Sequence, residues 1–201
     1  MPLYDDHSPG KFDGTDPLDA ARRHFERGRF AEAARALRFL IERDPTDPSA
    51  HAILALCLHR MGKAGDGERI LGRALKMSPR DPVVNAIAGH LCIESERFDR
   101  AEEHLLNTLD TQPHDDESMR LLAVCHSCRG RYPEALEIAQ RGLEMNPRNA
   151  GLWTVTGICQ HGLGRTEDAR ASNEKAAEIE ARAAKDATPA EPNRQDDPAG
   201  L

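Results

Sequence analysis

Four prolines recur at a fixed interval and constrain the fold of this chain more than any other feature. Pro45, Pro79, Pro113 and Pro147 stand 34 residues apart. Proline ends an α-helix because it lacks a backbone donor and clashes with the preceding turn. A fixed interval of this length predicts small repeating units that cannot bury a core alone and therefore stack side by side.

Other positions repeat with the same step. Leu37, Leu71 and Leu105 form an apolar series, which Ala139 continues. Two further series consist of small residues, which allow two helix backbones to approach closely where the helices of one unit cross. These series are Ala21, Ala55, Gly89, Ala123 and Gly157, and Ala33, Gly67, Ala101, Ala135 and Ala169.

Each unit contains two stretches of apolar residues at helical spacing, separated by a break. Gly28, Gly62, Gly130 and Gly164 mark this break in four units, and glycine commonly ends a helix. The predicted first helices are 17–27, 48–61, 82–95, 116–129 and 150–163. The predicted second helices are 31–43, 65–77, 99–111, 133–145 and 167–184.

These units resemble tetratricopeptide repeats. Trp153 with Gly157 is similar to the opening of that repeat, and three segments are similar to its second half, namely Phe30-Ala31-Glu32-Ala33, Phe98-Asp99-Arg100-Ala101 and Tyr132-Pro133-Glu134-Ala135. Gly67, Glu96 and Pro17 depart from the usual residues. The resemblance implies an all-α, right-handed superhelical solenoid of stacked helix-turn-helix repeats over about residues 14–183.

The predicted units are 14–47, 48–81, 82–115, 116–149 and 150–183. The last helix is expected to act as a C-terminal cap, because Asn173 replaces Leu or Ala and Ala181 replaces the closing proline. Residues 1–13 and the acidic, Pro- and Ala-rich tail 186–201 are expected to be disordered.

In a solenoid of this kind the first helix of each pair lines the concave face. The resemblance implies that this groove binds an extended peptide or a helix of a partner protein. The predicted groove residues lie one helical face away from the small-residue series. They are Arg22, Phe25, Leu56, His59, Arg60, His90, Ile93, Arg120, Val124, Ser127, Thr154, Ile158 and His161. Packing between neighbouring units is an equally good interpretation for any one of them.

Relatives that bind chaperone C-termini hold a carboxylate with Lys and Asn on three successive first helices. The corresponding faces here carry Leu18 and Arg22, Ile53 and Leu56, and Val83 and Ile87. The carboxylate clamp is therefore absent, and the groove is expected to favour apolar anchors.

Composition restricts the partners. The net charge is -7, but residues 1–19 hold one Lys against five Asp, so much of the charge lies at the ends of the chain. Aromatic residues make up only 4% of the chain, and Lys and Arg are not concentrated in a stripe. Nucleic acid is therefore not expected as a partner. No apolar run has the length of a membrane helix. An odd number of cysteines, five, is typical of reduced thiols and predicts a cytoplasmic protein.

Cys125-His126-Ser127-Cys128 is a CxxC motif, which can indicate metal or redox chemistry. The motif is predicted to lie within a helix. Cys57, Cys125 and Cys159 share one 34-residue series in which Leu91 takes the remaining place, which favours packing of the thiols as small apolar groups. His59, His90 and His161 could together bind a metal or make partner binding sensitive to pH, but no pair has the spacing of a known metal site.

The sequence therefore predicts a non-catalytic interaction scaffold without a cofactor, a metal site or catalytic residues. The first alternative is a cytoplasmic chaperone for an exported client, as in type III secretion, although such chaperones usually carry about three units. The second is a metal- or redox-active protein built on Cys125, Cys128 and the groove histidines. Self-association through the open ends of the solenoid is a further interpretation.

Overall fold

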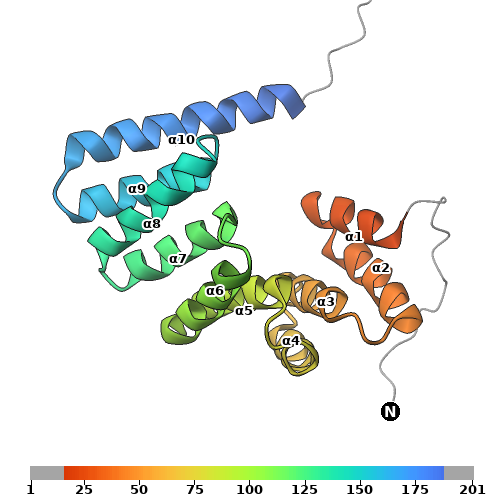
Figure 1. Ribbon diagram of the computed structural model, residues 1–201. Helices are drawn as coiled ribbons and strands as arrows, with labels where there is room; N and C mark the ends of the chain where they lie inside the picture. Colours follow the sequence, from red (N-terminus) through yellow and green to blue (C-terminus); the bar gives the residue numbers. More distant parts are fainter. Residues whose placement is uncertain (1–15, 188–201) are drawn as a thin grey trace, which may run out of the picture.

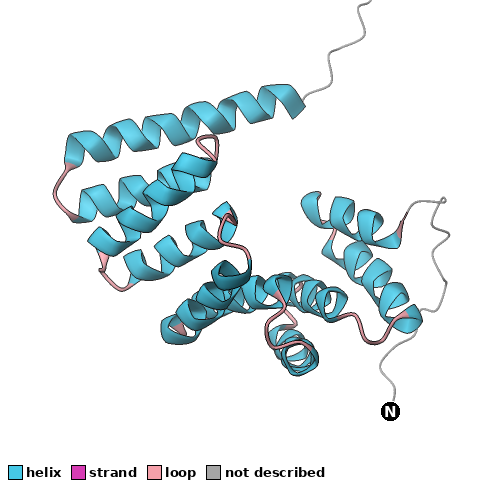
Figure 2. Ribbon diagram, viewed as in Figure 1, coloured by secondary structure: helices cyan, strands magenta, loops and turns pink. Residues whose placement is uncertain are grey.

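The structure, a computed structural model, describes residues 16–187, and this part consists of ten α-helices without a strand (Figures 1 and 2). The helices pair in chain order into five units, numbered 1 to 5. The first helices are α1 (Pro17–Glu26), α3 (Pro48–Arg60), α5 (Pro82–Glu94), α7 (Asp116–Cys128) and α9 (Ala150–Gly162). The second helices are α2 (Phe30–Arg43), α4 (Ala64–Met77), α6 (Phe98–Thr111), α8 (Tyr132–Met145) and α10 (Thr166–Ala187). The all-α repeat solenoid is confirmed.

Several helix boundaries differ from the prediction. The first helices end one residue earlier than predicted, at residues 26, 60, 94, 128 and 162. The second helices of units 1 to 5 begin one residue earlier than predicted, since the residue after the N-cap is already helical. Helix α10 continues to Ala187, so residues 186 and 187 are helical although the acidic tail was expected to be disordered from 186 onward. The remainder of that tail and residues 1–13 lie outside the described part of the chain.

Each first helix begins with the same capping interaction. The side chains of Asp47, Asp81 and Asp115 accept a hydrogen bond from the backbone N–H three residues later, at 3.0, 2.9 and 3.1 Å. Asn149 does the same at 3.1 Å, and Asp16 accepts from the N–H two residues later. These caps satisfy backbone donors that a helix N-terminus leaves free.

The turn inside each unit depends on one residue in the left-handed conformation. Gly28, Gly62, Gly130 and Gly164 have φ between 70° and 76°. The equivalent residue of unit 3 is Glu96, which has a φ of 56° and is the only described residue other than glycine with a positive φ. A side chain in this conformation is strained, because its Cβ lies too close to the carbonyl oxygen.

The two series of small residues lie where the paired helices cross, as predicted. Ala55, Ala101 and Ala123 are fully buried. A Cβ added to Gly89 would lie 2.6 Å from Leu105 Cγ, and one added to Gly67 would lie 2.8 Å from the backbone oxygen of Ala55. Larger residues would therefore force the helices of a pair apart.

The units stack into an arc that runs from α1 and α2 through the middle helices to α9 and α10 (Figure 1). Each of α3, α5, α7 and α9 packs against the second helix of the preceding unit. First helices of units 2 to 5 also contact one another, whereas second helices of neighbouring units make no comparable contacts in the described part. The first helices are therefore closer together and line the inner face of the arc.

Replacing Glu96 by glycine is expected to stabilise the protein. The substitution removes the strain at φ 56°, and the gain is about 1 kcal/mol in the free energy of unfolding after the greater flexibility of the unfolded chain is taken into account. Urea denaturation followed by circular dichroism measures the change.

The matched control is Gly62→Ala at the equivalent turn of unit 2. No atom lies within 4 Å of an added Cβ there, so only the backbone conformation opposes the change. We expect a loss of about 1 kcal/mol. A Glu96→Gly protein that is less stable than the wild type would contradict the assignment of strain to this turn.

Candidate functional site

The predicted groove residues all lie on first helices, the helices that line the inner face of the arc. Three of the apolar ones, Leu56, Ile93 and Val124, are half-buried and pack partly against the cores between neighbouring units. Ile158 is different, because 51% of it is exposed. Phe25 packs edge-on against Phe30, with ring centroids 5.2 Å apart. These apolar residues therefore contribute to the packing between units and also remain partly exposed on the first helices.

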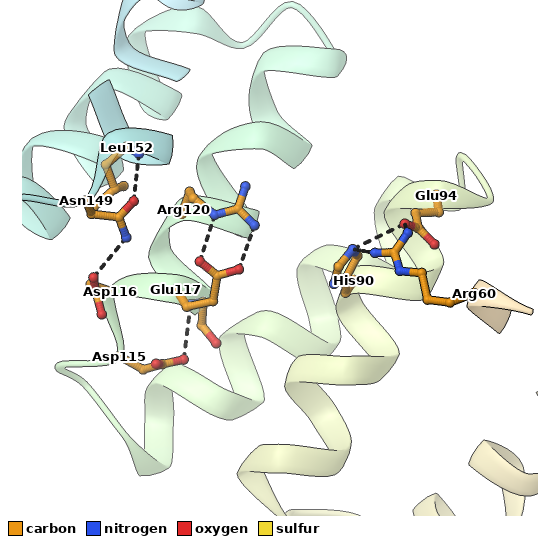
Figure 3. A network of polar contacts seen from close by, with 10 residues as sticks. Arg60, His90, Glu94, Asp115, Asp116, Glu117, Arg120, Asn149 and Leu152 are labelled. Carbon is orange, nitrogen blue, oxygen red and sulfur yellow. Dashed lines mark hydrogen bonds and ion pairs between the residues drawn. The ribbon is translucent and has the colours of Figure 1, made fainter. Parts of the chain in front are cut away.

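Three of the predicted polar residues, His59, Arg60 and His90, meet on one carboxylate that sequence reasoning missed, Glu94. Figure 3 shows Arg60 and His90 beside it. His59 Nε2 lies 2.9 Å from Glu94 Oε2, and Arg60 Nη1 lies 2.6 Å from Oε1. His90 Nε2 lies 3.3 Å from Oε1. The cluster joins α3 of unit 2 to α5 of unit 3. The repeat itself offered a signal for Glu94, because Glu94 occupies the position that the predicted groove residue Arg60 has one unit earlier.

His90 is half-buried within this cluster. Its pKa is lowered chiefly by burial, and Arg60 and Arg120 lower it further, while Glu94 and Glu117 oppose the change. Arg60 Nη2 lies 3.1 Å from His90 Nε2 and can donate to it only when that nitrogen carries no proton. The lowered pKa favours this neutral form.

Arg120 has a second missed carboxylate beside it, Glu117, one turn earlier on α7 (Figure 3). The guanidinium makes two hydrogen bonds to that carboxylate, of 2.7 and 2.6 Å. Glu117 also raises the pKa of Arg120. A Cβ added to Gly151 on α9 would lie 2.5 Å from Arg120 Cδ, so the next unit accommodates this side chain only because glycine stands there.

The remaining predicted residues do not join these clusters. Ser127 and Thr154 donate to backbone oxygens of their own helices, at 2.9 and 3.0 Å. Arg22 is exposed on α1 and pairs with Asp19 at 3.1 Å. His161 is exposed near the C-terminal end of α9. The structure thus brings His59, Arg60 and His90 together near the middle of the predicted groove, whereas Arg22 and His161, at its two ends, join neither cluster.

A further charged cluster joins units 3 and 4 around Glu102. Arg131 Nη2 and Arg129 Nη1 lie 2.6 and 3.0 Å from Glu102 Oε2, and His126 Nε2 lies 3.1 Å from Oε1. The hydrogen bond from Arg131 is the main cause of the lowered pKa of Glu102. His126 is only 8% exposed, and its Nδ1 atom is buried without a hydrogen-bond partner. Burial, then Arg131, lowers the pKa of His126, against the effect of Glu102.

The cysteines behave as packing residues. Cys57, Cys125 and Cys159 are fully buried, and burial raises the pKa of each thiol to about 11. Cys125 Sγ donates to the backbone oxygen of Phe98 at 3.3 Å. Cys128, by contrast, is exposed. Because a thiolate is the reactive and metal-binding form, the burial of Cys125 argues against chemistry at the CxxC motif.

Between residues 16 and 187, no group of three or more His, Cys, Asp or Glu side chains is placed to hold a metal ion. No helix in this part combines the length and the apolar character needed to cross a membrane.

Comparison with known sequences identifies the family. One tetratricopeptide repeat profile matches residues 18–82 and 128–192, and a second matches residues 93–153. The chain belongs to the tetratricopeptide repeat family. The repeats of this family form interaction scaffolds in general, and the chain has that coarse character.

Solved structures of MamA proteins have a similar tetratricopeptide fold. One crystal structure of MamA is 18% identical, with a TM-score of 0.64 over 82% of this chain and 96% of that chain. MamA AMB-1 is 21% identical, with a TM-score of 0.65 over 84% and 99%. MamA from Desulfovibrio magneticus RS-1 is 16% identical, with a TM-score of 0.61 over 86% and 96%. At these identities the similarity concerns the fold alone.

The thiols of the native protein should differ sharply in reactivity. Since Cys128 alone is exposed and burial raises the pKa of Cys57, Cys92, Cys125 and Cys159, one thiol of the five is expected to react rapidly with an aromatic disulfide reagent. Cys128→Ser should remove the rapid phase. Two or more rapid thiols in the folded protein would contradict this placement.

The stability of the protein should fall as the solution becomes acidic. The pKa values of His90, His104 and His126 are all lowered from 6.5, so the unfolded chain binds their protons first as the pH falls through that value. Replacing His126 by glutamine, which unit 5 carries as Gln160, should make the pH dependence shallower.

Urea denaturation at about pH 7 and about pH 5.5 measures this effect. The comparison is the difference in free energy of unfolding between the two conditions, not its value at either one. A folded His126→Gln protein with the same difference as the wild type would show that the buried histidine does not contribute.

Proposed function

We propose that this protein is a non-catalytic interaction scaffold that binds a peptide or helix of a partner protein on the inner face of the arc. The observation that supports the proposal is the strip formed by Leu56, Ile93 and Val124, which are half-buried and lie on three successive first helices. The strip is flanked by the cluster around Glu94 and by the pair of Glu117 with Arg120. Apolar anchors beside satisfied polar groups are typical of protein-binding surfaces.

Preorganisation supports the same function. The strip residues pack against the cores between units, so their side chains are already ordered before a partner binds. Binding then costs little conformational entropy on this side of the interface, and the partner segment contributes most of the ordering cost.

The charges favour apolar anchoring over binding of an anion. Arg60 and Arg120 are each compensated by a carboxylate, at 2.6 Å from Glu94 and from Glu117. An incoming carboxylate or phosphate would have to displace these partners. A terminal carboxylate and nucleic acid are accordingly the less suitable ligands, and a chaperone function for an exported client stays a narrower prediction within the same proposal.

Polar substitution of the strip tests the proposed function. Affinity capture with the full chain and mass spectrometry first identify the partner. The double variant Leu56→Asn/Val124→Asn is then expected to weaken the measured affinity by about tenfold or more, because two apolar anchors are lost. Since both residues also contribute to packing, circular dichroism and thermal denaturation must show a folded protein.

Two further variants make the result decisive. Ser127→Arg adds bulk and charge to the inner face without removing an apolar contact, and is expected to weaken binding as well. Leu106→Asn is the matched control, since Leu106 is 51% exposed on the second helix α6. If the inner-face variants bind the partner as tightly as the wild type does, or only Leu106→Asn loses binding, the proposal is wrong.

A further inference from the structure

The C-terminal end of the solenoid carries an open groove of about 650 Å³ between α9 and α10. Its centre is apolar, because Gly157, Ala169 and Ala177 surround the exposed side chain of Ile158. Its remaining lining residues are His161, Thr166, Arg170, Asn173 and Glu174. The groove is thus mostly apolar around Ile158, although Asn173 stands at the helix crossing where earlier units carry Leu or Ala, and its margin is charged.

The repeat shows what kind of structure fits this groove. One unit earlier, the residues equivalent to Ile158, Ala169 and Ala177 are Val124, Ala135 and Leu143. These three belong to the core cluster that receives α9. The groove in unit 5 is therefore the surface on which the first helix of a sixth unit would pack.

The helices that cover this surface in units 1 to 4 share one pattern. Each presents three small or apolar residues at positions i, i+3 and i+7, all facing the preceding unit. The triplets are Ala50, Ile53 and Cys57; Val84, Ile87 and Leu91; Ser118, Leu121 and Cys125; and Leu152, Val155 and Cys159. In α9 these residues are 0%, 1% and 0% exposed, which shows how completely the groove of unit 4 encloses them.

A second copy of the protein does not supply such a helix. The free end of the arc is α1, and the positions equivalent to the triplet there are Asp16, Asp19 and Arg23, all exposed. Placing these charges against Ile158 and Ala177 would remove them from water without apolar compensation. The sequence 188–201 does not contain the triplet pattern either. Neither α1 nor the sequence 188–201 therefore supplies the triplet.

The charges at earlier junctions define the partner helix further. Position 170 corresponds to Glu102 in unit 3 and to Glu68 in unit 2. Glu102 meets His126 at 3.1 Å and Arg131 at 2.6 Å, which stand at i+8 and i+13 of the incoming chain. Glu68 meets Arg97 at 2.8 Å, again at i+13. Arg97 and Arg131 follow the turn and are the N-caps of second helices, so only the i+8 position lies on the incoming helix itself. Arg170 reverses the charge, so an acidic residue at i+8 would complement it.

We infer that the groove between α9 and α10 binds an amphipathic α-helix of a different protein, which docks as the first helix of a sixth unit. The helix carries small or apolar residues at i, i+3 and i+7 and an acidic residue at i+8. Arg170 is available to it, because its 2.9 Å pair with Glu174 is exposed and weak. This site is separate from the strip of Leu56, Ile93 and Val124.

Two stapled helical peptides of about four turns provide the probes. Both carry Leu, Val and Ala at i, i+3 and i+7, and they differ only in Asp or Lys at i+8. Fluorescence anisotropy with the full chain should show tighter binding of the Asp peptide, by about threefold to fivefold. Arg170→Glu should reverse the preference. If the wild type binds neither peptide, or Arg170→Glu leaves the preference unchanged, the inference is wrong.

Two alanines of α10 give a matched pair of variants. Ala177→Glu places a charge in the groove, whereas Ala171→Glu places the same charge on an exposed position outside it. Both alanines are exposed, so both variants should fold, and only Ala177→Glu should abolish peptide binding. Equal binding by the two variants would overturn the proposed site.

The double variant Leu56→Asn/Val124→Asn separates this site from the proposed function. It should bind the stapled Asp peptide with unchanged affinity. A parallel loss of peptide binding in that folded variant would place the peptide on the strip and contradict a separate groove.

Discussion

Each helix pair of this protein can bury its apolar side only when the next pair covers it. The small residues at the helix crossings make this arrangement possible, because Ala55, Ala123 and Gly89 let the paired helices approach until their backbones nearly touch. The next first helix then fits the depression between them, as α9 does with Leu152, Val155 and Cys159. The helix caps, the turn inside each unit and the curvature of the arc together position the next first helix over this depression.

Much of this fold could be predicted from the sequence because the repeat supplies several independent signals for the same arrangement. The proline series, the small-residue series and the turn glycines each indicated the same helix pairs, and the residues of these series lie where they were predicted. The helix ends were predicted less accurately than the helix pairs, because capping geometry decides where a helix begins and ends. Glu96 adopts the left-handed conformation because it stands at the turn position of the repeat, although a residue with a Cβ atom disfavours that conformation.

The candidate site was less predictable, for a physical reason. Periodicity tells which side of a helix a residue occupies, but ion pairs depend on side-chain reach between units. The sequence indicated His59, Arg60 and His90 on one face, but not that all three would meet on Glu94. Leu56, Ile93 and Val124 are half-buried because of the distance between neighbouring units in space. The 34-residue period of the sequence does not define that distance. The binding role of the predicted groove residues therefore remains a prediction, whereas their arrangement on the first helices is known.

The two ends of the arc solve the problem of an uncovered unit in opposite ways. On α1 the positions that would face a preceding unit are charged, so this end is compatible with water and needs no neighbour. On α9 and α10 an apolar surface around Ile158 persists beside the polar Asn173, and its margin carries the charges of Arg170 and Glu174. Two polar ends would make a closed, purely soluble solenoid, and two apolar ends would make it polymerise. The two ends of the described arc thus differ, since one is polar and the other keeps the partly apolar groove to which we assign a helix of another protein.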